Sequence, residues 1–352
     1  MKVLSIVGAR PQFVKLAPVA SAMGKRDVEH VIVHTGQHYD DNMSDVFFRD
    51  LGIPSPNVHL GVGSGSHGVQ TGAMLGALDG VLEEHRPDWV LVYGDTNSTV
   101  AGALSAVKLH LPLAHLEAGL RSFNRRMPEE HNRVLTDHAA DLCLAPTERA
   151  AAHLRSEGLA ARTLVTGDVM TDVCLETARS AETLANPMGE HGLEKYALAT
   201  LHRAENTDEP ERLRAIVGAL AELPLPVVLT AHPRLVVRAQ QHGVDLGAGS
   251  VTVVPPLNYL SMVAAVRGAE MVITDSGGLQ KEAFLLRTPC TTIRTETEWG
   301  ETIELGWNLL CPEPSGIERS VTRARPQDTD AAPYGDGHSA DAVVEALTTW
   351  QL

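Results

Sequence analysis

Short apolar runs, each followed by a loop and a longer mixed segment, recur along the chain and constrain its fold more than any other feature. The runs lack the alternation of a half-exposed sheet, and helical stretches separate them, so they predict parallel sheets covered by helices on both faces. The predicted strands are Val3–Val7, Val31–His34, Trp89–Tyr93, Leu113–Leu116, Leu142–Ala145, Ala197–Thr200, Val227–Thr230, Val251–Val254, Met271–Thr274 and Cys290–Ile293. The predicted helices between them include Gln70–Glu84, Thr99–Leu109, Glu211–Ala221 and Leu279–Leu286.

The pattern occurs twice, which indicates two α/β domains in a chain of 352 residues. A helical stretch, Thr171–Ala185, leads into the helix-breaking sequence Asn186-Pro187-Met188-Gly189, so we place the boundary between residues 168 and 192. The expected division is a first domain at 1–168, a linker at 169–190, a second domain at 191–335 and a C-terminal helix within 336–352. Residues 312–337 read as loop, and Ser339 is the expected cap of a last helix, Ala340–Trp350.

Charge and cysteine content exclude several classes of protein. The chain has 29 Lys and Arg against 44 Asp and Glu, a net charge of −15, so it lacks the basic footprint of a nucleic-acid or anionic-membrane binder. Its 4 cysteines form no CxxC pair, which argues against a disulfide framework or zinc ribbon and for a reducing, cytoplasmic setting. The run Val3–Val7 is too short for a signal-peptide core or a membrane span.

In open α/β sheets, ligands bind beyond the carboxyl ends of the strands, so the residues after each apolar run are the candidates for a binding site. The first such turn is Gly8-Ala9-Arg10-Pro11, followed by Lys15, and it predicts an anion site at a helix N-terminus. The alternative is that Arg10 and Lys15 are solvated surface residues. Residues 63–68 spell GxGxxG but follow a weak strand, which favours a glycine loop over a dinucleotide site.

Carboxylates follow two neighbouring strands of the first half. Asp95 comes after Trp89–Tyr93, and Glu117 comes directly after Leu113–Leu116. Two further acids, Glu129 and Glu130, lie near Arg133. Together they suggest a proton-transfer site beside an anionic ligand. The alternatives are a helix-capping role for Asp95 and a surface cluster of ion pairs.

The second half carries the residues of a phosphate site. His202 and Arg203 follow one strand, and His232 follows the next. The segment Ser276–Gly278 opens a helix whose unpaired N–H groups suit a diphosphate, and Glu282 lies one turn further on, where it could accept from a ribose diol. The alternatives are structural histidines and a glycine turn capped by Ser276.

Six motifs, in their order and spacing, resemble the non-hydrolysing UDP-N-acetylglucosamine 2-epimerase family: GARPQ, GDTNST, HLEAGLRS, RMPEEHNR, ATLHRAEN and TDSGGLQKEA. The resemblance runs to about residue 310, with a further echo at Pro333–Gly337. It implies a GT-B-like fold of two Rossmann-like domains with parallel sheets facing a central cleft, and a C-terminal helix packing back on the first domain. It also implies a cytosolic homodimer that uses neither a metal nor a nicotinamide or other cofactor.

The reaction that the resemblance implies is inversion at C2 of a UDP-2-acetamido sugar, normally UDP-GlcNAc to UDP-ManNAc. UDP is lost as C2 is deprotonated, 2-acetamidoglucal and UDP stay bound, and UDP re-adds after the proton returns to the other face. The matching catalytic residues are Asp95, Glu117, Glu129 and His202, with Glu129 favoured over Glu130 by motif alignment. The expected substrate-binding residues are Arg10, Lys15, Arg133, Arg203, His232, Met262, Ser276, Gly277, Gly278 and Glu282.

Two departures from the family pattern bear on regulation and substrate. Tyr39 and Val69 stand where many bacterial members carry Arg for a second, activating UDP-GlcNAc, so we expect such activation to be weak or absent. The loop from Ser122 to Met127 is short, which resembles the branch acting on UDP-2,3-diacetamido-2,3-dideoxyglucuronate. The extra carboxylate of that sugar would need a cation, for which the candidates are Arg125, Arg126 and Arg294. UDP-GlcNAc is the first expectation and the uronate the alternative, ahead of a GT-B glycosyltransferase, a hydrolysing relative or a non-catalytic sensor.

Overall fold

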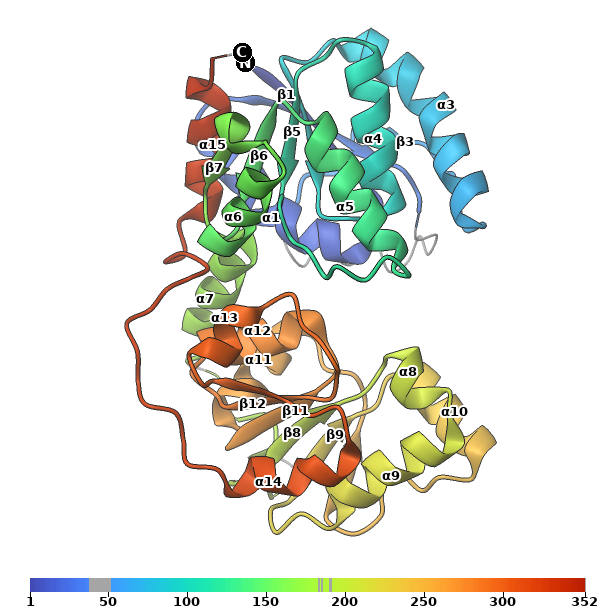
Figure 1. Ribbon diagram of the computed structural model, residues 1–352, viewed down its shortest axis with the longest axis vertical. Helices are drawn as coiled ribbons and strands as arrows, with labels where there is room; N and C mark the ends of the chain where they lie inside the picture. The colour runs from blue at the N-terminus through green and yellow to red at the C-terminus, as the bar shows by residue number, and fades with distance from the viewer. Residues whose placement is uncertain (38–51, 183, 185, 190–191, 352) are drawn as a thin grey trace. The chain divides into compact units, whose positions relative to one another are not determined.

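The structure is a computed structural model of the chain that describes residues 1–37, 52–182, 184, 186–189 and 192–351, with the side chain of Arg10 also outside the description. The chain forms two compact units (Figure 1). Unit 1 comprises Met1–Val173 together with Ala332–Leu352, and unit 2 comprises Cys174–Ala331. The change from one unit to the other falls inside helix α7 (Val169–Ala181).

Unit 1 is built on a seven-stranded parallel sheet, in the order β3-β2-β1-β4-β5-β6-β7. Its strands are β1 (Lys2–Val7), β2 (Glu29–His34), β3 (Val58–His59), β4 (Trp89–Tyr93), β5 (Leu113–Leu116), β6 (Leu142–Ala145) and β7 (Thr163–Val165). Its helices are α1 (Arg10–Lys25), α3 (His67–His85), α4 (Asn97–Lys108), α5 (Pro128–Ala139), α6 (Glu148–Ser156) and α15 (Ser339–Thr349).

Unit 2 repeats the design with a six-stranded parallel sheet, in the order β10-β9-β8-β11-β12-β13. Its strands are β8 (Ala197–Thr200), β9 (Val227–Thr230), β10 (Val251–Val254), β11 (Met271–Thr274), β12 (Cys290–Thr292) and β13 (Asn308–Leu310). Its helices are α8 (Ala204–Thr207), α9 (Pro210–Ala221), α10 (Pro233–His242), α11 (Tyr259–Gly268), α12 (Gly277–Leu285), α13 (Gly300–Glu304) and α14 (Ile317–Thr322). The predicted class, α/β with parallel sheets, is confirmed.

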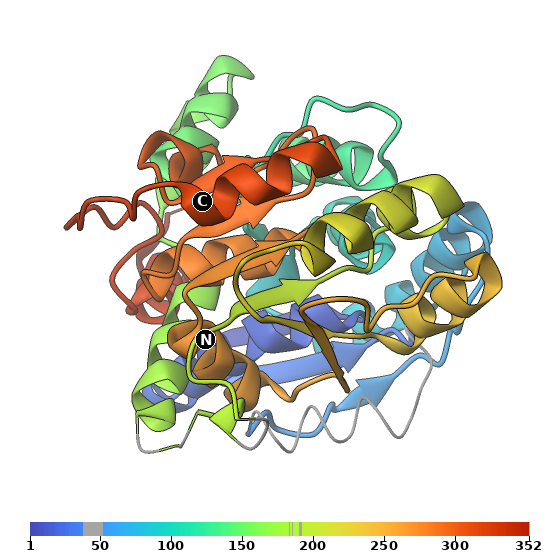
Figure 2. The same cartoon turned by 90° about the horizontal axis from the view of Figure 1, so that it is seen from below.

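Helices cover both faces of the unit 2 sheet, which explains why most residues of its strands are buried. On one face, side chains of α9, α10 and α14 pack against the strands, as Leu213, Leu235 and Ile317 show. On the other face, α11 and α12 contribute residues such as Val266 and Ala283. Helices α9 and α14 lie below the strands of this sheet in Figure 1 and face the reader in Figure 2.

The unit 1 sheet is covered in the same way. Helices α1 and α15 share a buried cluster with β1 and β4, in which Leu16 and Val343 are fully buried. Helix α4 covers the opposite face and lies close to it: a Cβ added to Gly102 would lie only 2.8 Å from Ile6 and 3.0 Å from Val92. Trp89 Nε1 donates to the carbonyl of Leu347 at 3.0 Å, which joins β4 to the C-terminal helix.

Two local predictions at the C-terminus were wrong. Helix α15 begins at Ser339 itself, and its first amides, of Ser339 and Ala340, donate to the carboxylate of Asp172 at 3.0 and 2.7 Å. The carboxylate of Asp172 on α7, distant in sequence, therefore caps the start of α15, which is the role that we expected of Ser339. The stretch 312–337 is not all loop, because α14 lies within it and buries Ile317 in the core of unit 2.

Candidate active site

The strand orders place a topological switch point in each sheet. In unit 1, β1 and β4 are hydrogen-bonded neighbours, and the strands that follow each of them lie on opposite sides. In unit 2, β8 and β11 are related in the same way. Loops that leave two such neighbours run apart and leave a crevice at the carboxyl ends. Each predicted catalytic residue except Glu129 lies within two residues of the end of one of these strands or of their neighbour β5.

Glu117 and Lys15 form an ion pair in unit 1, with side chains 11% and 13% exposed. Burial alone would lower the pKa of Lys15, but the charges of Glu117 and Asp95 outweigh it and the pKa is raised. Lys15 therefore stays an ammonium ion beside the carboxylate. Glu117 itself has φ +73°, a conformation that costs a non-glycine residue roughly 1–3 kcal/mol and often marks a functional site.

Gly94 makes room for this pair. Its φ is +62°, and an added Cβ would lie 3.2 Å from both Glu117 Oε2 and Lys15 Nζ. Any side chain at this position would press on the two charged groups.

Arg133 of α5 connects two carboxylates. Its Nε and Nη2 lie 2.9 and 2.8 Å from Asp95 Oδ2, and its Nη1 donates to Glu130 Oε2 at 2.9 Å. Asn132 Nδ2 donates to the carbonyl of Asp95 at 2.9 Å. Asp95 is thus held by α5 and does not cap α4, whose cap is Thr96.

The two adjacent glutamates have different surroundings. Glu130 is buried and accepts from the amides of Ser122 and Phe123, both at 2.9 Å. Burial would raise its pKa, but these bonds and the charge of Arg133 lower it. Glu129 is half-buried and makes no hydrogen bond or ion pair with the described part of the chain. Glu130 therefore shapes the loop 122–127, whereas the carboxylate of Glu129 has no partner among the described residues.

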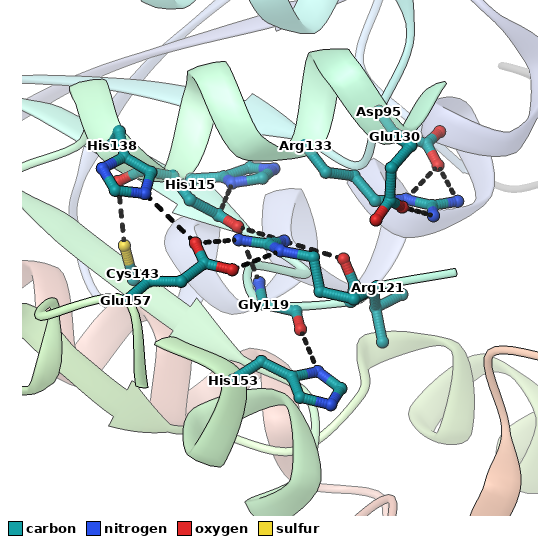
Figure 3. Close-up of polar contacts among 12 residues, drawn as sticks. Asp95, His115, Gly119, Arg121, Glu130, Arg133, His138, Cys143, His153 and Glu157 are labelled. Atoms are coloured by element: carbon teal, nitrogen blue, oxygen red, sulfur yellow. Dashed lines mark hydrogen bonds and ion pairs between the residues drawn. The ribbon is translucent and has the colours of Figure 1, made fainter. Parts of the chain in front are cut away.

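A buried polar network underlies these loops (Figure 3). The ring of His115 lies between Asp137 Oδ1, 2.6 Å from Nδ1, and the carbonyl of Gly94, 2.7 Å from Nε2. The other oxygen of Asp137 lies 2.7 Å from Arg121, which also binds Glu157. Burial would raise the pKa of Asp137, but its contacts with His115 and Arg121 lower it. The network ties Gly94, the residue before Asp95, to β5, the strand that Glu117 follows.

The turn after β1 is filled by a side chain that we did not predict. Gln12 Oε1 accepts from the amides of Gly8 and Ala9 at 2.8 and 3.0 Å, and its Nε2 donates to the carbonyl of Tyr93 at 2.9 Å. The two amides that a phosphate would use here are therefore occupied, and Lys15 is paired with Glu117. The side chain of Arg10, also expected at this turn, lies outside the described residues.

In unit 2, Asp275 joins the loops after β8 and β11. His202 Nδ1 lies 2.9 Å from Asp275 Oδ1, and Arg203 donates through Nε to the carbonyl of Asp275 at 2.9 Å. Ser276 caps α12 by accepting from the amide of Leu279 at 3.3 Å. A Cβ on Gly278 would meet nothing within 4 Å, so the backbone at this helix N-terminus is open to a ligand.

The remaining predicted residues of unit 2 lie on three helices. Glu282 is buried one turn into α12, where its Oε1 accepts from the hydroxyl of Tyr259 at 3.0 Å. His232 is exposed, and its ring accepts from the amide of Arg234 at 3.3 Å at the start of α10. Met262 of α11 is partly buried against the apolar cluster of that face.

The sequence did not predict the side-chain contacts of three residues near the candidate site: Asp275, Asp137 and Gln12. Asp275 and Gln12 lie inside motifs that we singled out, yet their partners are distant in sequence. No periodicity or spacing links Asp137 to His115, 22 residues away. Among the described residues, no group of three or more His, Cys, Asp or Glu side chains could hold a metal ion, and no described helix is long and apolar enough to span a membrane.

Two parallel Rossmann-like sheets, with acids and an open helix N-terminus at their carboxyl ends, define a GT-B-like α/β protein with a candidate anion site. Comparison with known proteins makes the class specific. The family model described as UDP-N-acetylglucosamine 2-epimerase matches residues 21–348. The chain belongs to this family, whose activity is that of an isomerase.

Individual relatives match over nearly the whole chain. A Pseudomonas aeruginosa protein named UDP-2,3-diacetamido-2,3-dideoxy-D-glucuronate 2-epimerase is 46% identical, with 99% of each chain covered. A Methanocaldococcus jannaschii UDP-N-acetylglucosamine 2-epimerase is 40% identical, also with 99% of each chain covered. The crystal structure of a UDP-GlcNAc 2-epimerase from that organism, in complex with UDP-GlcNAc and UDP, superposes with a TM-score of 0.88 at 39% identity, again with 99% coverage of both chains.

Proposed function

We propose that this chain is a non-hydrolysing epimerase that interconverts UDP-GlcNAc and UDP-ManNAc. The observation that carries the proposal is the set of carboxylates in unit 1: Asp95 and Glu117 follow adjacent strands, and Glu129 begins the next helix. Inversion at a carbon needs a proton to leave one face and return to the other, so one base is not enough.

The chemistry must also activate a C2 proton that has no adjacent carbonyl. Loss of UDP supplies the driving force: a carboxylate takes the C2 proton, the C1–O bond breaks and its electron pair leaves with the diphosphate. The neutral product is 2-acetamidoglucal. A proton then returns to the opposite face of C2, and the UDP oxygen re-adds at C1. Atoms and electrons balance, and no redox partner is needed.

Unit 2 supplies groups suited to the UDP part. The open N-terminus of α12 at Ser276–Gly278 can accept the diphosphate, and Arg203 and His202 lie on the adjoining loop. Glu282 is placed one turn further along α12 for a ribose hydroxyl. In unit 1, Lys15 and Arg133 hold the side chains of Glu117 and Asp95 in place through ion pairs.

A direct test is proton NMR of the purified protein with UDP-GlcNAc in D₂O. UDP-ManNAc carrying deuterium at C2 is the expected product, and the D95N variant should slow its formation by about 10²–10⁴-fold. Release of free ManNAc would instead identify a hydrolase. Turnover only with an added acceptor would identify a glycosyltransferase.

A second candidate substrate is UDP-2,3-diacetamido-2,3-dideoxyglucuronate, favoured by the relative at 46% identity. Of the three cations considered for its carboxylate, Arg294 is buried and bound to both oxygens of Glu298 at 3.1 and 3.2 Å. Arg125 and Arg126 are exposed on the loop 122–127. The same NMR assay, run with each sugar on wild type and on R125A/R126A, compares the two candidate substrates. If the variant loses turnover of the uronate but keeps turnover of UDP-GlcNAc, the uronate is the substrate.

We also infer a cytoplasmic homodimer. The four cysteines are buried and form no disulfide, which fits a reducing compartment. On α3, the glycines at 68, 72, 76 and 80 recur at every fourth position, and an added Cβ at each would meet nothing within 4 Å. Such a face allows a helix of a second copy to approach closely. Light scattering should give twice the chain mass, and G76L should shift the mass toward the monomer.

A further inference from the structure

One carboxylate, that of Asp275, holds together the two loops of unit 2 that border its switch point. Asp275 follows β11, and its side chain is fully buried. It accepts from the amides of His202 and Arg203, at 3.1 and 3.0 Å, and from Asn206 Nδ2 at 3.1 Å. All three partners lie on the loop and short helix that follow β8.

The same carboxylate also contacts the ring of His202, whose side chain is half-exposed. Burial would raise the pKa of Asp275, but its bonds to His202 and Asn206 lower it, so the group is ionised. An ionised carboxylate only accepts hydrogen bonds, which means that Nδ1 of the ring must carry the hydrogen. No described residue is a partner for Nε2 of His202.

We propose that Asp275 is a positioning residue for His202, a role that rests on the proposed function. It fixes the Nδ1–H tautomer and the ring orientation, so every proton that His202 gives or takes passes through Nε2. Because Ser276–Gly278 follow Asp275 directly, the contact also sets the ring against the helix N-terminus proposed for the diphosphate. Nε2 is then held where it can donate a proton to the diphosphate oxygen that leaves C1.

The competing explanation is that Asp275 only ties the two loops together. The loop amides and Asn206 would account for its burial without any role for the ring. The two explanations differ in what they predict for the tautomer of His202 and for the kinetics of paired variants.

The first measurement is the tautomer of His202 in the ligand-free full-length protein, by two-bond ¹H–¹⁵N NMR of the ring. We expect protonated Nδ1 in wild type, and a shift toward the Nε2–H tautomer in D275N because the amide can donate to Nδ1. An Nε2–H tautomer in wild type would overturn the proposal. This measurement needs no turnover, so it stands apart from any failure of the proposed epimerase activity.

The second measurement is kinetic. D275N should lower kcat by roughly 10²–10⁴-fold with KM changed less than about 3-fold, because the orientation of a transition-state group is lost and ground-state binding is kept. D275E should recover part of kcat. N206A is the matched control: it removes a bond to the same carboxylate without touching the ring, so it should lower Tm and keep kcat within about 3-fold.

A double variant completes the test. If Asp275 acts through His202, adding D275N to H202N should change kcat by less than about 3-fold. A further loss of roughly 10²-fold or more would show that Asp275 acts independently of the ring and would contradict the proposal.

Discussion

Arg133 places two of its guanidinium nitrogens on the same oxygen of Asp95, 2.9 and 2.8 Å away, although the residues lie 38 positions apart in sequence. The same guanidinium binds Glu130. A residue expected to bind substrate therefore also fixes the position of a proposed catalytic acid. The relationship gives the first of four predictions.

R133M should lower kcat by about 10–10²-fold, because Asp95 loses its orientation and Glu130 is left buried without its cation. R133K should recover only part of the activity, since an ammonium group cannot contact both carboxylates with the same geometry. The measurement is steady-state epimerisation of UDP-GlcNAc. R126A, on the exposed loop, is the control and should retain wild-type rates with this substrate.

Glu129 and Glu130 should separate activity from stability. E129Q should lower kcat by about 10²–10⁴-fold and leave Tm unchanged, because its carboxylate has no partner in the described chain. E130Q should lower the free energy of unfolding by roughly 1.5–3 kcal/mol, since it weakens charge-assisted bonds to Arg133 and the 122–127 loop. Thermal unfolding and kinetics on both variants are sufficient. The reverse pattern would assign the catalytic role to Glu130.

Asp137 should make unit 1 sensitive to acid. Its folded pKa is lowered from 3.8, so its stabilising contribution is fully present above that value and is lost as the pH falls through the lower, folded value. D137N should be less stable at neutral pH by about 1–3 kcal/mol, because Arg121 keeps Glu157 but the charge-assisted contacts of His115 and Arg121 with Asp137 are weakened. Urea unfolding at several pH values should show the gap between wild type and variant narrowing toward low pH. An equal gap at every pH would contradict this account.

Activation by a second UDP-GlcNAc should be weak or absent. Val69 is 70% exposed at the start of α3 and offers no charge to a ligand, and Tyr39 lies outside the described residues. UDP-ManNAc alone should therefore be epimerised without a lag, with a Hill coefficient of about 1. A lag that trace UDP-GlcNAc abolishes would show that the activating site is present. The lag and the Hill coefficient should be measured in parallel for V69R, which restores an Arg at this position.

The fold class was predictable from the sequence because burial on both faces of a parallel sheet leaves a local signature. All ten predicted strands are present, with ends that differ by at most two residues. Three strands lie outside these ten: β3 has 2 residues, and β7 and β13 have 3 each. All three lie at sheet edges, where burial is incomplete and the apolar signal is weak.

The sequence by itself determined the α/β class, the two-fold repetition and which residues follow the strand ends, because these depend on local hydrophobic patterning and on motif order. Only the tertiary structure decided how those residues are used. It showed that Gln12 occupies the amides of the first turn, that Arg133 holds Asp95, and that Asp275 holds His202. These contacts join segments that the sheet topology brings together. A hydrogen bond depends on the distance between two atoms in space, and the spacing of residues along the chain does not give that distance.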